Sequence, residues 1–566
     1  MFIKLTRSGP RQYVQLVEAY RDEAGKAKQR TLATLGRVED LQDSVDSVIA
    51  GLLKVTGRDP GLLAPPKSTS VRFEPARALG DVWALTHLWK ELGFHDLRRT
   101  FRRTRHSIDV EALIRIMVLN RLCDPESKLG VLRWLETVAL PEVDIKAVTH
   151  QHLLRSMDAL VDQQEEVEAV VAGLLRPLVD QDLSVVFYDL TTIRAEGGST
   201  QDADVRKFGM SKEGIIARQF MVGVVQTAEG IPLYHEVFDG NTSEATTLLP
   251  TVQKVLARFP SLKRVVLVAD RGLLSLDNLD ALRSVQVRDG QPLEFILAVP
   301  GRRYGEFVGL LADFQAGCTQ ATEEIIGELK WNELRLVVAH DPVRAQEQSE
   351  LRKARLADLE KRAEEYAKKL EAQSAGIKAR GRKLSSSGAK ARVYHQVADA
   401  HLLKILKVDT ASDLFSYDLD ENALAKAELM DGKLLLVTNV PDLRPEQVIE
   451  RYKSLADIER GFKVLKSEIE IGPVYHRLPQ RIRAHAMICF MALILHRVMR
   501  LRLREAKASI SPERALAALQ RIQQHQVTID QKSPLRGVST LSGEQSAVLK
   551  ALRIPRPTDG QQLTLL

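Results

Sequence analysis

The chain has 566 residues, which is too many for a single hydrophobic core, so we expect three or more domains. Its 81 basic and 74 acidic residues leave a net charge of only +7, so any binding of nucleic acid depends on where the charges lie. The three cysteines are far apart, without metal-ligand spacing, which excludes structural zinc and disulfides and favours a reduced, cytoplasmic protein.

The N-terminal residues and the length of the longest apolar stretch argue against a membrane protein. The first residues, MFIKLTRSGPRQYV, lack the apolar core of a signal peptide. The longest apolar stretch, residues 486–495, is too short to span a bilayer and predicts a buried helix. We therefore expect no membrane partner.

The N-terminal third divides into a β-rich part and a helical part. Residues 2–35 alternate between apolar and polar side chains, with turn residues at 8–10 and 23–26, which predicts a small antiparallel sheet within an N-terminal segment, 1–60. Helical periodicity then dominates from residue 79 to about 178, with breaks at 124–126 and 140–144. We predict a helical DNA-binding domain at 61–180.

One basic segment of this domain, LRRTFRRTRH, stands out. Helical spacing puts Arg98, Arg102 and Arg105 on one face, and Arg99 and Arg103 widen that face. A basic run is often only a solvated helix face, but five arginines without an acid among them predict a surface that binds DNA phosphates.

Two apolar runs each end in an aspartate. Residues 184–190 (SVVFYDL) carry Asp189, and residues 264–272 (RVVLVADRG) carry Asp270. Both runs are apolar on both faces, as in central strands of a covered sheet. The carboxyl ends of neighbouring strands converge in such sheets, so the two aspartates are expected at one rim, where a hard cation would offset their repulsion.

A third acid lies in RYKSLADIERGFKVLK, which starts at Arg451. On one helix, Tyr452, Leu455, Glu459, Phe462 and Lys466 would share a face. Taken singly, each aspartate is typical of a turn or helix cap, and Glu459 of a solvated side chain. Together the three carboxylates form the all-oxygen ligand set that magnesium or manganese prefers.

In these features the chain resembles the bacterial DDE transposases of the insertion-sequence-four superfamily, most closely the branch numbered sixteen thirty-four. The resemblance runs from about residue 80 to about 505 and rests on motifs in order: FYDLTT, FGMSKEG, IPLYHEVFDGNTSE, VADRG, DGKLLLVTN and GPVYHRLPQRIRAHAMICFMAL. The superfamily signature is Tyr, two residues, Arg, three residues, Glu, six residues, Lys. Tyr452, Glu459 and Lys466 fit it, but Leu455 replaces the arginine.

The fold class expected on this basis is α/β, with an RNase H-like catalytic core. Strands at 183–190, 264–270 and 293–300, a strand pair at 215–239 and helices at 243–258 and 275–286 predict a mixed five-stranded sheet covered by helices in the first part of the core, 181–300. A large insertion, 301–430, contains a strand at 331–340 and a long charged helix, which we expect to be part of a helical hairpin arm. The second part of the core spans 431–505 with a strand at 433–439, and a helical tail spans 506–566.

The resemblance implies a transposase that cleaves DNA at transposon ends and joins them to target DNA. Asp189, Asp270 and Glu459 would hold two Mg²⁺ ions, or Mn²⁺ as a substitute, about 4 Å apart for in-line phosphoryl transfer. Lys466 would hold a phosphate, and Tyr452 would contact the same strand. The implied partners are double-stranded DNA, as terminal inverted repeats and target, and further copies of the chain in a dimer or higher assembly in the nucleoid.

Two other functions stay open. A degenerate or domesticated relative would only bind DNA, and Leu455 is the feature in favour of it. An RNase H-like nuclease that is not a transposase is disfavoured by Tyr452 and Lys466. In some family members an aromatic residue of the insertion stacks on a displaced base, but the strand alternation around Trp331 favours core packing.

Overall fold

The computed structural model describes residues 1–557 except 42–43, 58–70, 103–107, 180–183, 199–202, 212–213, 272–275, 319–320, 377–383, 410–414 and 530–533, and it does not describe the side chains of 184, 276–278 and 457–459. The chain forms two compact units. The first comprises Met1–Pro75 and His525–Gly537, and the second Ala76–Gln524 and Val538–Gln562.

The first unit contains the predicted N-terminal sheet. Strands β1 (Phe2–Ser8), β2 (Arg11–Arg21) and β3 (Ala27–Arg37) pair antiparallel, and helices α1 (Val38–Leu41) and α2 (Val45–Val55) follow. Gly9 and Gly25 supply the positive φ angles, 63° and 78°, that the two tight connections need. A second small sheet pairs β17 (Gln523–Ile529) with β4 (Val71–Phe73) and β18 (Leu535–Val538).

The second unit begins with the predicted helical block, and its helices end close to the expected breaks. It contains α3 (Gly80–Glu91), α4 (Leu97–Phe101), α5 (Val110–Cys123), α6 (Lys128–Thr137), α7 (His150–Asp162) and α8 (Gln164–Leu175). The side chains of Asp109, Ser127 and Thr149 accept backbone hydrogen bonds at the starts of α5, α6 and α7. Two later helices, α18 (Pro512–Gln520) and α19 (Gly543–Ala551), also belong to this unit, and α18 packs on α3.

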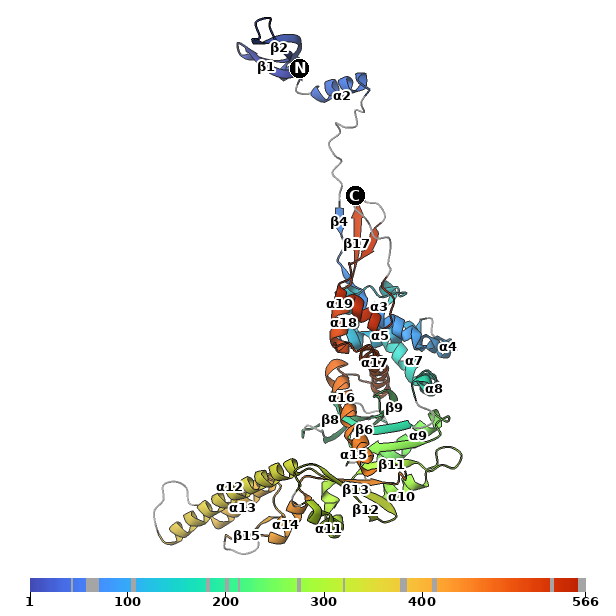
Figure 1. The fold of residues 1–566 in the computed structure, drawn as a ribbon, viewed down its shortest axis with the longest axis vertical. Helices are drawn as coiled ribbons and strands as arrows, with labels where there is room; N and C mark the ends of the chain where they lie inside the picture. The colour runs from blue at the N-terminus through green and yellow to red at the C-terminus, as the bar shows by residue number, and fades with distance from the viewer. Residues whose placement is uncertain are drawn as a thin grey trace. The chain divides into compact units, whose positions relative to one another are not determined.

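A mixed sheet forms the centre of the second unit (Figure 1). The expected strands are present as β6 (Ser184–Arg194), β8 (Ile216–Thr227), β9 (Pro232–Asp239), β10 (Val265–Ala269) and β11 (Glu294–Ala298). Their order is β9-β8-β6-β10-β11. Pairing is antiparallel among β6, β8 and β9 and parallel among β6, β10 and β11.

Among the residues that the structure describes, the sheet has nine strands, so the prediction of five was too low. Strand β7 (Lys207–Met210) pairs with β8, and β16 (Lys433–Thr438), β13 (Leu334–His340) and β12 (Ile325–Trp331) continue the sheet beyond β11. The single strand predicted at 331–340 was wrong at its start, because Trp331 ends β12. Asn332 and Glu333 form the hairpin turn with φ angles of 45° and 61°.

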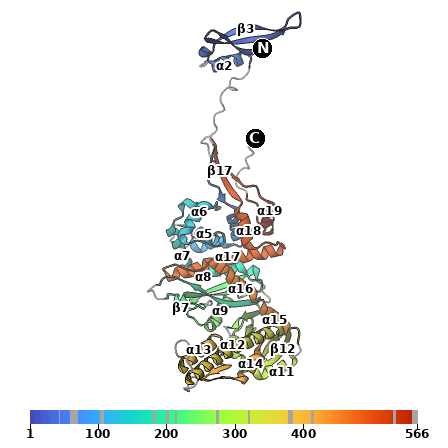
Figure 2. The same cartoon turned by 90° about the vertical axis from the view of Figure 1, so that its left-hand side faces the viewer.

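Helices cover the sheet and connect it to the helical block. The helices next to the central strands are α9 (Glu244–Arg258), α10 (Leu276–Ser284), α15 (Pro445–Lys453) and α16 (Ala456–Lys463). The long helix α17 (Pro479–Glu505) packs on α5, α7 and β9, and it lies between the helical block and the sheet in both views (Figures 1 and 2). Helix α17 is long and apolar enough to cross a bilayer, but 94% of its most apolar window is buried, which confirms the predicted core helix.

The insertion forms the predicted helical hairpin and has its own core. Its helices are α11 (Val308–Cys318), α12 (Pro342–Ser374), α13 (Ser386–Asp399) and α14 (Glu421–Met430), with a short hairpin of β14 (Leu406–Val408) and β15 (Tyr417–Leu419). Leu356, Leu359 and Ala363 of α12 pack with Val393 and Val397 of α13. We call residues 342–430 the arm (Figure 1).

Candidate active site

Two of the predicted acids lie on neighbouring parallel strands, Asp189 within β6 and Asp270 directly after β10. Strands β6 and β10 pair so that Tyr188 lies opposite Ala269, and the next residues along the two strands are Asp189 and Asp270. Neighbouring strands lie about 4.8 Å apart, so the two carboxylates are adjacent. Both residues are intermediate in exposure and therefore accessible from solvent.

The alternation of side chains decides which face carries the acids. Tyr188 is fully buried, and its hydroxyl donates a hydrogen bond of 2.8 Å to Thr247 Oγ1 on α9. Because successive side chains of a strand point to opposite faces, Asp189 lies on the face away from α9. Helix α15 packs on β10 and helix α16 packs on β6, so the segment after the sheet comes to the acids.

Tyr452 of α15 contacts one acid of the pair, Asp270, directly. Its hydroxyl donates a hydrogen bond of 2.8 Å to Asp270 Oδ1. Burial, and then the neighbouring Asp270 carboxylate, raise the pKa of Tyr452 above its ordinary value, while Arg271 opposes this shift. The phenol therefore remains a neutral donor at pH 7 and fixes the orientation of the Asp270 carboxylate.

The predicted single helix from Tyr452 to Lys466 is broken, which corrects the sequence interpretation. Helix α15 ends at Lys453, α16 starts at Ala456, and Lys466 lies in a π-helical turn, Val464–Glu468. Leu455 lies in the break and is 7% exposed, because its apolar side chain packs into the core. Helical periodicity continues in the sequence across this break, so the pattern could not reveal it.

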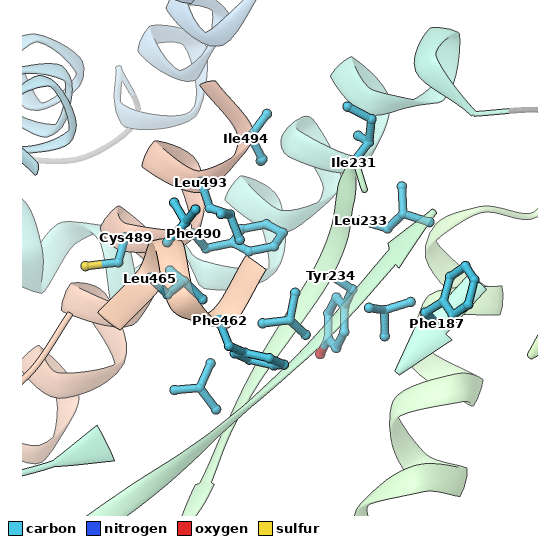
Figure 3. Close-up of a cluster of buried hydrophobic side chains, with 14 of the residues drawn as sticks. Phe187, Ile231, Leu233, Tyr234, Phe462, Leu465, Cys489, Phe490, Leu493 and Ile494 are labelled. Atoms are coloured by element: carbon cyan, nitrogen blue, oxygen red, sulfur yellow. The ribbon is translucent and has the colours of Figure 1, made fainter. Parts of the chain in front are cut away.

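Buried side chains anchor the segment that carries Glu459. Phe462 of α16 and Leu465 of the π-turn belong to a cluster with Tyr234 of β9 and Phe490 of α17 (Figure 3). Glu459 lies in α16, which packs on β6, but its side chain is outside the described part of the chain. Among the side chains that the structure describes, no three acids, histidines or cysteines gather as a metal site. The place of the third carboxylate stays a prediction.

Family comparisons agree with this arrangement. Residues 3–65 match the model for the N-terminal domain of the IS1634 family transposase, and residues 180–495, more than half of the chain, match the transposase DDE domain. The chain belongs to the DDE transposases and is IS1634-like. No curated protein matches it.

The arginine surface predicted for this transposase is only partly described. Helix α4 ends at Phe101, Arg102 is exposed at its C-terminus, and Arg103 and Arg105 fall outside the described residues. Arg98 is bound by Glu111 at 2.9 Å and by Asp109 at 3.3 Å, both in or next to α5. Two carboxylates from outside the basic segment therefore offset the Arg98 charge. DNA binding by these arginines stays a prediction.

The structure also describes two further predicted side chains of the transposase, Trp331 and Lys466. The ring of Trp331 lies against Phe307, with ring centroids 5.0 Å apart, so it packs on the core side of the insertion. Lys466 is intermediate in exposure in the π-turn.

Sequence reasoning missed Arg271 as a site residue. It directly follows Asp270, is exposed, and is one of the groups that lower the pKa of Tyr452 against the effect of burial. The signal was present in the VADRG motif, since a residue adjacent to a site acid is close to the site by connectivity alone. Its position near a tyrosine far along the chain could not be predicted from the motif.

Proposed function

We propose that this transposase cleaves the phosphodiester bonds at the two ends of its element and joins the freed 3′ ends to target DNA. The observation that carries the proposal is the pair of aspartates on neighbouring strands, Asp189 within β6 and Asp270 directly after β10, with Tyr452 hydrogen-bonded to Asp270. The strand order β9-β8-β6-β10-β11 supports an RNase H-like core around that pair. The implied partners are the terminal inverted repeats, target DNA and further copies of the chain.

The donor set fits hard divalent cations. Asp189 and Asp270 offer only oxygen atoms, the ligands that Mg²⁺ and Mn²⁺ prefer, and Glu459 would complete the set. When bound, two such ions supply activation of the attacking oxygen and stabilisation of the leaving oxygen. The protein needs no nucleophile of its own for this chemistry.

The remaining side chains would orient the acids and the DNA strand. Tyr452 holds the Asp270 carboxylate in one orientation through its hydroxyl. Arg271 and Lys466 supply positive charge for the phosphates on either side of the cleaved bond. Arg271 would thereby provide the phosphate contact that the signature arginine supplies in relatives, since Leu455 is buried in this chain.

The test is a set of substitutions that preserve shape and remove charge. Asp189→Asn, Asp270→Asn and Glu459→Gln should each abolish cleavage and strand transfer in Mg²⁺, and end binding should stay within a few-fold, because DNA contacts lie mostly elsewhere. Cleavage is measured on a labelled inverted repeat and binding by fluorescence anisotropy. Asp442→Asn is the matched control, since Asp442 binds Arg264 at the opposite end of β10.

Each outcome bears on a definite part of the proposal. Substantial cleavage by one acid variant removes that residue from the site. Full cleavage after exhaustive chelation of divalent ions contradicts the metal mechanism. Tight and specific end binding without cleavage by the unmodified protein, in Mg²⁺ or Mn²⁺, would instead support the DNA-binding alternative.

A further inference from the structure

A cavity of about 550 Å³ lies apart from the acid pair, within the second unit. Its walls come from α5, the starts of α6 and α7, and residues 470–485, which follow the π-turn. Its basic lining residues are Arg121, Lys128, His150, His476, Arg477, Arg481 and His485, beside the acids Glu126 and Glu470. A cavity of this size accommodates a small ligand such as one nucleotide.

Lys128 is the most unusual residue of the cavity. It is 7% exposed, and within the described chain its ammonium group has no hydrogen bond and no ion pair. Burial, and then the nearby Arg121, lower the pKa of Lys128 to about 7. A buried cation without a partner is costly, so the site is incomplete without an anion.

Arg121 is a second buried donor beside this space. It is 4% exposed and donates to the carbonyl oxygens of Ile469 and Glu470, but its Nε has no partner among the described residues. His485 donates through Nε2 to the Ile471 carbonyl at 2.9 Å, so in the neutral ring its Nδ1 is an acceptor and adds no donor for an anion. Two buried cationic side chains with unused donors, Lys128 and Arg121, thus lie beside one cavity.

The first turn of α6 adds a second kind of anion donor. Ser127, Lys128 and Leu129 line the cavity at the N-terminus of this ten-residue helix. Helix N-termini present backbone N–H groups and a partial positive charge, which favour phosphate. The helix start and the unpaired Lys128 point to the same class of ligand.

The cavity wall is braced against the strand that carries Asp189. Arg206, fixed by Asp204 at 2.9 Å, donates to the carbonyl oxygens of His476 at 3.1 Å and Arg477 at 3.0 Å. The Val474 N–H donates to the Arg194 carbonyl at the end of β6, 3.0 Å away. At about 3.3 Å per residue, the five steps along the strand from Asp189 to Arg194 span about 17 Å.

We propose that this cavity binds one phosphate group of a DNA strand, held by Lys128, Arg121 and the start of α6. The proposal rests on the proposed function for the source of the phosphate. Tyr475 lines the cavity and is 73% exposed, so its ring is open for stacking by the base attached to that phosphate. The phosphate is either the 5′-terminal group of a strand or an internal phosphodiester.

The first experiment uses inorganic phosphate and the full-length protein without DNA. Phosphate should raise the melting temperature of the unmodified protein, and Lys128→Met should weaken phosphate binding about tenfold or more, because a charge-assisted contact is lost. Lys146→Met, which removes a charge from an exposed site in the same helical block, is the control. An equal phosphate response in the Lys128→Met variant overturns the proposal.

Stability separates a binding role from a structural one. Because the folded pKa of Lys128 is below that of the unfolded chain, the unfolded state binds more protons, and stability should rise as pH rises through about 7 towards the ordinary lysine value of about 10.4. Lys128→Met should remove this dependence and melt at a higher temperature at pH 6. A structural lysine would give the opposite result, a lower melting temperature.

Phosphate binding should also weaken as pH rises past about 7, where Lys128 loses its proton. The charged and titratable groups that face it come from every surrounding element: Arg121, Glu126, His150, Glu470, Tyr475, His476, Arg477, Arg481, His485 and Cys489. Two of these groups are the histidines His476 and His485. Burial, and then the charge of Lys128, lower the pKa of His476 to about 3 and the pKa of His485 to well below its ordinary value. Both are neutral at pH 7, so they do not produce the transition.

The last experiment identifies the source of the phosphate and is independent of cleavage. End DNA with and without a 5′-phosphate is titrated against Asp189→Asn protein in the absence of divalent ions. If the terminal group occupies the cavity, the 5′-phosphate should improve binding and Lys128→Met should remove the improvement. If an internal phosphate does, Lys128→Met should weaken both DNAs equally. No effect on either DNA overturns the proposal, even if cleavage is normal.

Discussion

Tyr452 connects parts of the site that are far apart in sequence. Its hydroxyl reaches Asp270, 182 residues earlier, whereas sequence analysis assigned it a contact with DNA. A neutral phenol that donates to a carboxylate limits that carboxylate to one orientation and leaves its second oxygen for other partners. The residue is therefore expected to act on the geometry of Asp270 before it acts on DNA.

Tyr452→Phe should slow single-turnover cleavage by up to about tenfold, since one hydrogen bond to a charged group is lost. End binding should change little. Tyr234→Phe is the control, because it removes a phenol–carboxylate bond of 2.6 Å to Glu236 outside the site. If Tyr452 instead contacts DNA, its variant will lose affinity in anisotropy titrations together with cleavage.

At the level of single residues, the sequence predicted site residues that follow directly from a neighbouring apolar run. It did not predict contacts between residues that are far apart in the chain. Asp189 and Asp270 were found because each ends an apolar run that becomes a buried strand. Lys128 reads as an ordinary lysine at a helix start. Its burial depends on residues 470–485, more than 340 positions away, and no local pattern contains that information.

Secondary-structure elements were predicted well where burial and periodicity coincide. The strands of the core and the helices between them follow the apolar pattern, because each strand is covered on both faces. The hairpin of β12 and β13 was harder to predict. The apolar–polar alternation continues through Trp331 into the hairpin turn, and only the positive φ angles of Asn332 and Glu333 reveal that turn. Likewise, the break between α15 and α16 is set by packing around Leu455.

Helix α4 allows a prediction at the scale of an element. Arg102→Ala should lower the slope of log affinity against log salt by about 0.9 if Arg102 contacts a phosphate. Arg98→Ala and Arg99→Ala should lower it less, because Glu111 and Asp109 bind Arg98 and Asp96 binds Arg99. The check is a salt titration on end DNA and on unrelated DNA. An unchanged slope for Arg102 would identify α4 as an ordinary solvated helix.

The second unit contains two hydrophobic cores, and the arm contacts the main one at its two ends and through α14, which packs on α11. The arm leaves the sheet after β13 and returns at β16, and these strands are neighbours in which His340 pairs with Lys433. The Asp341 N–H donates to the Gly432 carbonyl at 3.0 Å, so the two ends of the arm touch. The arm packs its own core around Leu359 and Val393.

Replacing residues 341–432 by Asn-Gly should therefore leave a folded catalytic core, since a two-residue turn suits adjacent antiparallel strands. Circular dichroism and a cooperative thermal transition check the fold. Hydrogen exchange should show protected amides in β6 and β10 as in the full-length protein. Loss of protection in those strands would mean that the sheet depends on the arm.

The touching ends of the arm also affect how such a protein can change over generations. A segment that leaves and returns at one corner can lengthen, shorten or be exchanged for an unrelated segment without altering the pairing of β13 with β16. Chemistry in the sheet and any recognition by the arm are then free to diverge at separate rates. A lineage built in this way could acquire new recognition sequences while it inherits its reaction unchanged.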